Sequence, residues 1–403
     1  MFTDKKLGIS NQDKLRIEHQ KLLYKLFRDG QTYSCADIAR ATGLSNTAAA
    51  NIVDALLKYR IVRQSESSGM ISMGRPPVLY ELNPDYGLVA AIDLTDEDLI
   101  VTVSDMKMRI LHRSVIPGCV YITAEILNQL VKLLKDFLNG GQTAFEKYSA
   151  ICIGTPGKIS AETGNFIFAP KFVNYKSVNL HKIFSAAFDT LIVIKNDIKL
   201  ALMGESYFGS AVDKKNVVYL HIDHNYGGAV KSNGKILEGE HGFAGEFGGM
   251  RVLNRGEQFR YVSYSVSLGG MVYHWENHYR ELGTLKERET TLNVQNFIDL
   301  YHEGDPVVVK IAEEAAEATA VEILNTVMLL DATTIILDGK IKELGKRYLE
   351  KIEQYLNTYI YDDLRIEVSY SLLQGRATIL GGLRCAIDTV TKSILNQTAN
   401  EDN

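Results

Sequence analysis

The sequence has few of the residues that build disulfide frameworks, zinc clusters or membrane spans. Its 403 residues include only four cysteines, which lie far apart without a CxxC pair, so we expect buried free thiols. The apolar runs, such as Leu191–Ile194, are far shorter than a membrane span. The first residues, MFTDKKLGISNQDK, lack the apolar stretch of a signal peptide. These absences predict a cytoplasmic protein with no membrane partner.

Charge is unevenly distributed along the chain. The net charge is −5, yet residues 1–82 carry 12 lysines and arginines against 8 acidic residues, and the remainder carries 32 against 41. A basic head on an acidic body is consistent with a head that binds a polyanion, although chance can also produce so small an excess. The length predicts two to three domains, so the charge has to be interpreted together with the motifs of each part.

Residues 34–56 have the pattern of two short helices joined by a tight turn. Ser34 can cap a first helix that extends to about Thr42, Gly43 supplies the turn, and Ser45 can cap a second helix. A hairpin with a polar tip is predicted next, as in the wing of a winged helix-turn-helix domain. The alternative is a helical hairpin used only for packing. Turn residues, periodicity, wing and charge together favour DNA binding.

The second helix predicts which residues contact DNA. Its exposed N-terminal face would carry Asn46, Thr47 and Asn51, whose small polar side chains suit the base edges of a major groove. We expect these three residues to read a double-stranded operator. Phosphates or the minor groove would be anchored by three further residues: Ser45, Arg63 and Arg75. The apolar face of the helix is expected to be Ala49, Ile52, Val53 and Leu56.

Beyond a proline-bracketed junction near residues 80–88, strands and helices alternate. Strands are predicted at 89–93, 99–105, 109–116 and 151–154, with a helix at 121–138. Further strands are predicted at 191–197, 216–223, 334–339 and 365–371, with a hairpin turn at 232–235 and a last helix from about 374. Three strands followed by alternating helices and strands, occurring twice, predict a two-lobed α/β body.

Polar residues fall at the carboxyl ends of these strands, where α/β proteins bind ligands. Asn196 and Asp197 close one strand, Gly157 follows another, and Glu246 lies in the glycine-rich stretch HGFAGEFGGM, residues 241–250. Two carboxylates and an amide beside glycine backbone suit a polyhydroxyl ligand. The pair Asn196-Asp197 also fits the N-cap of the next helix, and the two roles are compatible.

The chain resembles the ROK family of repressors, unassigned open reading frames and sugar kinases, and specifically its repressor branch. The resemblance covers nearly the whole chain, through GRPP (74–77), TPGKI (155–159), KNDIKLALMGE (195–205), HGFAGEFGGM (241–250) and TIILDG (334–339). It implies an N-terminal winged helix-turn-helix followed by a two-lobed α/β body with the actin-like, ribonuclease-H-like ATPase fold. It also implies operator binding as a dimer or tetramer, controlled by a sugar or sugar phosphate.

The resemblance assigns roles and boundaries to this sequence. Asn196 and Asp197 match the family's sugar-binding pair, Asp197 matches its catalytic base, Glu246 matches the acid of the E-x-G-H motif, and Gly157 matches the turn beside the sugar. The expected domains are a head at 1–82, a first lobe at 88–197 and a second lobe at 198–384. The C-terminal helix at 385–403 is expected to pack back on the first lobe.

Departures from the family pattern predict lost chemistry. Gly249 replaces the histidine of E-x-G-H, and the zinc cysteines are replaced by Phe259, Tyr261 and Val266, so no zinc is expected. A sugar-contacting glutamate is replaced by Leu268. On the nucleotide side, the phosphate-binding glycines are replaced in three stretches: Asp93–Asp98, Asp223–Gly228 and Asp338-Gly339. Leucine and carboxylates in place of glycine oppose phosphate binding, so we expect no ATP cofactor.

These observations predict a non-enzymatic transcriptional regulator of carbohydrate metabolism, with Asp197 as a vestigial base. One alternative is a sugar kinase that carries a DNA-binding head. Another is a regulator whose cleft is vestigial and which answers to a protein partner. The long helices at 305–330 and 374–398 suit either a subunit interface or packing within the body. Glu205, on the helix after Asp197, is expected to be solvated.

Overall fold

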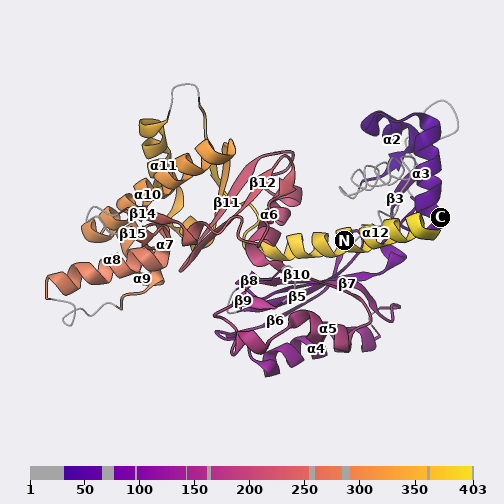
Figure 1. The fold of residues 1–403 in the computed structure, drawn as a ribbon, viewed down its shortest axis with the longest axis horizontal. Coiled ribbons are helices and arrows are strands. Elements are labelled where there is room, and N and C mark those ends of the chain that lie inside the picture. Colours follow the sequence, from indigo (N-terminus) through magenta and orange to yellow (C-terminus); the bar gives the residue numbers. More distant parts are fainter. Residues whose placement is uncertain are drawn as a thin grey trace, which may run out of the picture. The chain divides into compact units, whose positions relative to one another are not determined.

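The computed structural model describes residues 31–65, 77–95, 98–141, 143–160, 165–253, 259–283, 291–360 and 364–401. The chain forms two compact units (Figure 1). Unit 1 consists of residues 1–153, 179–194 and 382–403, and unit 2 of residues 154–178 and 195–381. This division differs from the predicted domains. The head and the first lobe share a unit, and residues 154–178 and 195–197 belong with the second lobe.

The head begins with β1 (Tyr33–Ser34), α2 (Cys35–Thr42) and α3 (Asn46–Lys58), followed by the hairpin of β2 (Val62–Gln64) and β3 (Leu79–Leu82). The three strands form one sheet in the order β1-β3-β2. The predicted caps are confirmed: Ser34 forms a capping box with Asp37, Gly43 adopts a left-handed φ of 72°, and the Ser45 hydroxyl accepts from the Ala48 amide at 3.2 Å.

The first lobe of unit 1 is a five-stranded sheet in the order β10-β7-β4-β5-β6. Its strands are β4 (Leu88–Asp93), β5 (Leu99–Asp105), β6 (Ile110–Ile116), β7 (Tyr148–Thr155) and β10 (Leu191–Asn196), close to the predicted ranges. A short 3-10 helix, η1 (Pro84–Tyr86), connects the head to β4. β4 pairs antiparallel with β5, and β5 with β6.

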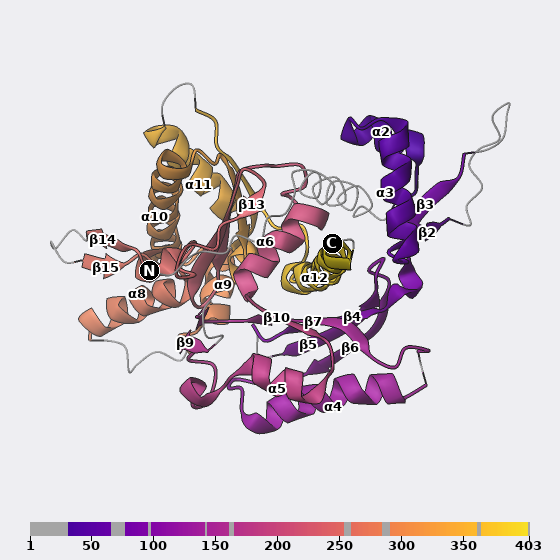
Figure 2. The same ribbon diagram turned by 45° about the vertical axis from the view of Figure 1, so that its right-hand side comes forward.

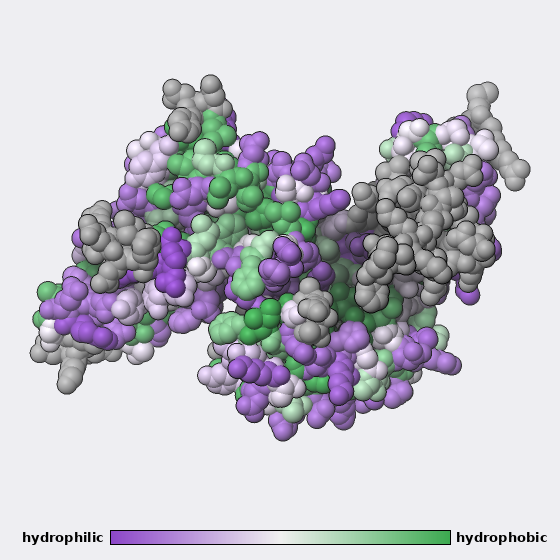
Figure 3. All heavy atoms as spheres, in the orientation of Figure 1, coloured by the Kyte–Doolittle hydropathy of each residue, from purple (hydrophilic) through white to green (hydrophobic). Residues whose placement is uncertain are grey.

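Helices cover both faces of this sheet. α4 (Ala124–Asn139) and α5 (Leu180–Ala187) lie on one face, and the C-terminal part of α12 (Ala377–Glu401) lies on the other (Figures 1 and 2). α4 buries Leu127, Leu130 and Leu134 at helical spacing. Hydrophilic residues predominate on the outer side of the α4 and α5 layer, at the bottom of Figure 3, as expected for amphipathic helices.

Unit 2 contains a second five-stranded sheet, in the order β13-β12-β11-β16-β17. Its strands are β11 (Val217–Ile222), β12 (Tyr226–Ser232), β13 (Lys235–Ile236), β16 (Thr334–Asp338) and β17 (Glu367–Tyr370). β11, β16 and β17 run parallel, whereas β12 and β13 are antiparallel. Asn233 and Gly234 adopt φ values of 50° and 77°, which confirms the predicted hairpin turn. The strand order therefore repeats that of the first sheet.

The helices of unit 2 pack on this sheet around two hydrophobic core clusters. They are α6 (Asp197–Phe208), α7 (Ser263–Val266), α8 (Leu268–Glu281), α9 (Val294–Glu303), α10 (Pro306–Leu330) and α11 (Gly345–Tyr359), with the 3-10 helices η3 (Phe247–Gly249) and η5 (Lys340–Leu344). The larger cluster includes Trp275 of α8 and Phe297 of α9, whose rings meet edge to face, and the smaller one includes Ala201 and Leu202 of α6. Smaller elements complete the described chain: β8 (Lys158–Ile159), β9 (Phe166–Phe168), η2 (Tyr175–Ser177), β14 (Arg251–Leu253) and β15 (Phe259–Tyr261). No helix in the described ranges is long and apolar enough to cross a membrane.

Candidate functional site

The outward face of α3 carries the residues predicted to contact DNA. Asn46, Thr47 and Asn51 are exposed, and so is Ser45 at the cap. The opposite face is buried in the head through Ala49, Ile52, Val53 and Leu56, as predicted. The N-terminal turn of α3 therefore presents small polar side chains together with the positive end of the helix dipole.

The two arginines predicted for the wing lie in different situations. Arg63 is part of β2, and its guanidinium already pairs with two carboxylates of its own chain: Glu81 and Asp85, both within 2.8 Å. Arg75 lies outside the described residues. Arg40, which the sequence reasoning missed, extends from the last turn of α2 with its side chain 80% exposed. The sign of its charge and its place on the helix before the turn were available from the sequence.

Asn196 and Asp197 lie where β10 gives way to α6. The Asn196 side chain caps the helix by accepting from the Lys199 amide at 3.1 Å, which confirms the N-cap prediction. Asp197 is only 5% exposed, and its Oδ1 accepts from the amide of Ile198 at 2.9 Å. Both side chains are thus fixed by local backbone amides at the start of one helix.

The glycine-rich stretch with Glu246 is held against the same strand as the start of α6. At Gly245, with φ of 90°, a Cβ would lie 2.6 Å from the carbonyl oxygen of Gly228 on β12. At the adjacent Gly227, a Cβ would lie 2.5 Å from the Ile198 side chain of α6. The Glu246 loop and the first turn of α6 therefore flank neighbouring residues of β12, and the glycines permit this approach.

Lys158 is a residue of this site that sequence reasoning missed. Gly157, before it, adopts φ of 100°, and its missing Cβ leaves room for the carbonyl of Phe168. The Lys158 ammonium lies 3.3 Å from a Glu246 carboxylate oxygen and 4.3 Å from the centroid of the Phe243 ring. The turn with Gly157 is thereby connected to the Glu246 loop. The position directly after Gly157 was the available sequence signal.

A second set of charges in unit 2 is centred on Glu238. The ammonium of Lys199, 8% exposed, and that of Lys195 both approach the Glu238 carboxylate, at 3.2 and 2.7 Å. Although partial burial opposes ionisation, the two lysines hold the pKa of Glu238 below its ordinary value. All four residues predicted for the effector site, Gly157, Asn196, Asp197 and Glu246, lie in unit 2. Their surroundings contain both hydrogen-bond donors and hydrogen-bond acceptors, which suits hydroxyl groups as ligands.

The carboxyl ends of β11 and β16 in the unit 2 sheet are closed by carboxylates. Asp338 is buried at the end of β16, where it accepts from the Tyr219 hydroxyl at 2.5 Å and pairs with the Lys342 ammonium. Burial opposes its ionisation, but Lys342 and Tyr219 hold the pKa of Asp338 below its ordinary value. Asp223, after β11, accepts from the Lys340 amide at 3.1 Å. Donors that could meet a phosphate are thus engaged by side chains of the chain itself.

In the first sheet, the carboxylate at the end of β4 is likewise hydrogen-bonded by groups of the chain itself. The carboxylate of Asp93, 7% exposed, accepts from the amide and hydroxyl of Thr95 at 3.0 and 2.5 Å. Leu94 is fully buried between them. An isobutyl side chain in this turn takes the space that a glycine would leave open for a ligand.

Comparison with known proteins decides the family. The sequence profile of the ROK family matches residues 89–386. The chain belongs to the ROK family. It is 23% identical over 402 residues to the xylose repressor of Caldicellulosiruptor bescii, covering 94% of this chain and 98% of the relative.

Solved structures show the same fold. The crystal structure of a ROK family transcriptional regulator, a homologue of the E. coli MLC protein, matches with a TM-score of 0.77 and 18% identity over 96% of this chain and 100% of that chain. The ROK hexokinase of Thermus thermophilus matches with a TM-score of 0.65 and 19% identity over 76% of this chain and 99% of that chain. The body thus has the actin-like, sugar-kinase-type fold of the ROK family. The regulator match extends over a larger share of the chain than the hexokinase match.

The positions of the zinc ligands implied by the ROK resemblance do not fit a metal. Tyr261 lies on β15 with the Arg251 guanidinium 3.6 Å from its ring centroid, and Val266 is fully buried in the core. In the described parts of the chain, no group of three or more His, Cys, Asp or Glu side chains gathers as metal ligands. Aromatic packing and a cation–π contact stabilise this segment, and neither needs thiolates.

The expectation for Glu205 is wrong. Its side chain is fully buried in unit 2, where its two oxygens accept from the Ser371 hydroxyl at 2.5 Å and from the Ser210 amide at 2.6 Å. Burial raises the pKa of this carboxyl. Glu205 lies near the end of α6, and its hydrogen bond with Ser371 joins α6 to the residue that follows β17. The carboxyl group therefore has a structural role in the core and is not solvated.

Substitution of Gly245 by alanine is expected to destabilise unit 2 by about 2 kcal/mol or more, because it combines an unfavourable positive φ with a close backbone contact. Gly249→Ala, in the same loop, has open space and no positive φ, so it serves as the matched control. Thermal unfolding of the two variants checks the expectation. Equal melting temperatures would show that the loop adjusts without strain.

Proposed function

We propose that the protein is a sequence-specific, DNA-binding transcriptional regulator of carbohydrate metabolism, acting as a repressor, whose effector is a sugar or sugar phosphate. One observation carries the proposal. A helix–turn–helix and hairpin, with its outward polar residues exposed, precedes a ROK body of the sugar-kinase type. The name of the xylose repressor that the chain resembles along its length supports the same role.

In this proposal the head is a winged helix-turn-helix domain. Asn46, Thr47 and Asn51 of α3 contact base edges in the major groove, and the Ser45 end of the helix faces phosphate. Arg75, which lies between β2 and β3 in the sequence, anchors the backbone or the minor groove. The partner is double-stranded operator DNA, bound by a homodimer or tetramer so that two heads engage two half-sites.

The effector binds through Asn196, Asp197 and Glu246, with Gly157 as the turn beside it. The carboxylates accept hydrogen bonds from sugar hydroxyls, and the amide of Asn196 has both donor and acceptor atoms. Lys158 already pairs with Glu246, so a hydroxyl that binds Glu246 competes with or joins this pair. Binding that favours one state of the protein then shifts its affinity for the operator.

The regulator is not a sugar kinase in this proposal. Asp197 retains the position of the family's base, but the phosphate side is occupied by the chain's own groups: Asp338 with Lys342 and Tyr219, Asp223 with the Lys340 amide, and Asp93 with Thr95. A carboxylate at contact distance from a phosphate costs roughly 1 kcal/mol even in water. No zinc and no ATP cofactor are therefore assigned.

The decisive experiment is selection of bound DNA from a genomic fragment library by the purified protein, followed by release with a sugar panel. Enrichment of a short two-fold site, released by one sugar class, is the expected result. Phosphorylation of a sugar by ATP would instead support the kinase with a DNA-binding head. DNA binding that no sugar alters would support control by a protein partner.

Asn51→Ala is expected to weaken operator binding by about 5- to 150-fold and to relax specificity at one base position, since a lost base contact costs roughly 1–3 kcal/mol. Gel-shift titration against the selected site and single-base variants checks this. Asn139→Ala, an exposed asparagine at the end of α4, is the matched control. Unchanged discrimination in the Asn51 variant would contradict base reading by this residue.

A further inference from the structure

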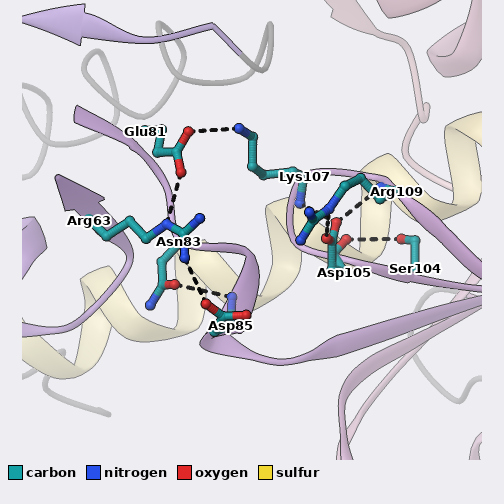
Figure 4. Close-up of polar contacts among 8 residues, drawn as sticks. All are labelled: Arg63, Glu81, Asn83, Asp85, Ser104, Asp105, Lys107 and Arg109. Carbon is teal, nitrogen blue, oxygen red and sulfur yellow. Dashed lines mark hydrogen bonds and ion pairs between the residues drawn. The ribbon is translucent and has the colours of Figure 1, made fainter. Parts of the chain in front are cut away.

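A buried carboxylate joins the head to the first lobe within unit 1 (Figure 4). Glu81 lies on β3 with its side chain 8% exposed. Its Oε1 accepts from Nε of Arg63 at 2.8 Å, and its Oε2 accepts from Nζ of Lys107 at 2.8 Å. Arg63 belongs to the head, whereas Lys107 belongs to the turn between β5 and β6 of the lobe. One carboxylate is therefore held by two cations from two parts of the unit.

The electrostatics favour the ionised form of this carboxylate. Burial opposes ionisation, but the hydrogen bonds from Lys107 and Arg63 hold the pKa of Glu81 below its ordinary value. Arg63 and Lys107 are themselves more exposed, at 35% and 22%. The carboxylate is thus the central member of the group, because it contacts both cations.

The turn that carries Lys107 is fixed by a second buried carboxylate. Asp105, 4% exposed, accepts at Oδ1 from the amides of Lys107 and Arg109 at 2.8 and 3.0 Å. Its Oδ2 accepts from Nε of Arg109 at 2.5 Å, as Figure 4 shows. Met108 completes the tight turn with φ of 61°. The ammonium of Lys107 is therefore presented from an ordered turn.

The segment between head and lobe is packed as well. Asn83 is 6% exposed, its Nδ2 donates to the Arg60 carbonyl at 2.9 Å, and its Oδ1 accepts from the Asp85 amide at 3.1 Å. Asp85 in turn accepts from Nη1 of Arg63 at 2.7 Å. At Gly87 a Cβ would lie 2.0 Å from the Ser149 hydroxyl of β7. The connection follows the surface of the lobe too closely to act as a free tether.

We infer that Glu81 is the positioning residue that sets the DNA-binding head on the first lobe, and that Arg63 serves this joint together with Lys107 instead of contacting DNA. The inference rests on the proposed function of the head. Head and first lobe move as one body, so an effector signal reaches α3 through the lobe. A buried ion pair suits this task because its geometric demands fix an arrangement more than they stabilise it.

The test uses the full-length protein and four variants: Arg63→Met, Lys107→Met, Glu81→Gln and the double variant Arg63→Met/Lys107→Met. Lys107→Arg is the conservative rescue. Lys132→Met, which removes a lysine of an exposed pair on α4, is the matched control. Hydrogen exchange of residues 61–64 and 79–88 is measured without DNA. Affinity for the selected operator is measured as a function of salt, with and without the releasing sugar.

If Glu81, Arg63 and Lys107 together form the joint between head and lobe, Arg63→Met and Lys107→Met are expected to have the same effects. Each substitution increases hydrogen exchange in both segments by about tenfold and reduces the effect of the sugar on operator binding. The effect of the double variant is smaller than the sum of the two single effects. Lys107→Arg restores both the exchange rate and the sugar response. The salt slope stays that of the wild type. The inference is overturned if Arg63→Met alone lowers the salt slope by about one, the signature of a lost phosphate contact, while Lys107→Met matches the control.

The two readouts separate this inference from the proposed function. If the wild-type protein binds no DNA, the proposed function fails, whereas hydrogen exchange still reports on the joint. Exchange in residues 61–64 and 79–88 that no variant alters would overturn the joint even if operator binding is normal.

Discussion

Replacement of Glu322 by glutamine is expected to raise the melting temperature of the protein by roughly 10 °C at about pH 9, with little or no gain at about pH 5. Glu322 lies on α10 with 4% exposure, and within the described ranges neither carboxylate oxygen has a hydrogen-bond partner. Burial raises its pKa to about 8, and the nearby Tyr226 hydroxyl, which does not reach hydrogen-bond geometry with it, offsets only part of this effect.

The sign of the pH dependence follows from the direction of the pKa shift of Glu322. A carboxyl whose pKa is higher in the folded state favours folding fully below its unfolded pKa, which is near 4.5, and this contribution is lost as pH rises through about 8. The loss is on the order of 5 kcal/mol, because one pKa unit corresponds to about 1.4 kcal/mol. Glutamine stays neutral, so its variant lacks this loss.

Calorimetric melting between about pH 5 and pH 9 measures the effect directly. Glu314→Gln, an exposed glutamate of the same helix, is the matched control and should track the wild type at every pH. Parallel melting curves for the wild type and the Glu322 variant would contradict a raised pKa. Such a result would mean that the carboxylate is solvated in the native protein.

Local features of the fold were predictable because each depends on a few adjacent residues. Ser34, Gly43 and Ser45 mark helix ends by their side chains, and the structure has those ends where they were predicted. The strands were readable from alternating or continuous apolar runs, and the strand triplets of both lobes follow from their spacing. The two-sheet body needed no information beyond these patterns.

Contacts between distant residues were not predictable in the same way. The pairs Lys158 with Glu246 and Glu81 with Lys107 join segments whose separation in sequence contains no signal of contact. Glu205 was expected in solvent because carboxylates on helices usually are exposed, yet Ser371 and the Ser210 amide satisfy it in the core. Tertiary partners decide whether a charge is buried, and a single sequence does not contain them.

The candidate effector site combines both kinds of information. The sequence indicated Asn196, Asp197, Glu246 and Gly157 from their motifs, and the structure adds the charges around them. Lys158 next to Glu246, and Lys199 next to Glu238, mean that these two carboxylates of the region are matched by lysines. A neutral polyhydroxyl ligand can exchange hydrogen bonds with such pairs without leaving a charge unpaired. This balance is the physical reason to test neutral sugars first.

Glu246→Gln and Asp197→Asn are each expected to weaken sugar binding by about 10- to 100-fold, since a hydrogen bond to a charged acceptor contributes roughly 1.5–3 kcal/mol. Both substitutions preserve shape, and asparagine at position 197 can still accept from the Ile198 amide. Glu240→Gln, an exposed acid shortly before Glu246 in the chain, is the matched control.

The measurement is a thermal-shift screen of the wild type against neutral sugars, sugar phosphates and ATP with magnesium, followed by calorimetry of the variants with the sugar that binds. Any ligand of the native state raises the melting temperature, so the screen can find the effector among many candidate compounds. A shift with one sugar that both site variants lose and Glu240→Gln retains supports the sensor. A shift with ATP would mean that the carboxylates on the phosphate side still admit a nucleotide, and it would restore the kinase. No shift with any compound would leave the head as the functional part of the protein and direct the search for its control to a protein partner.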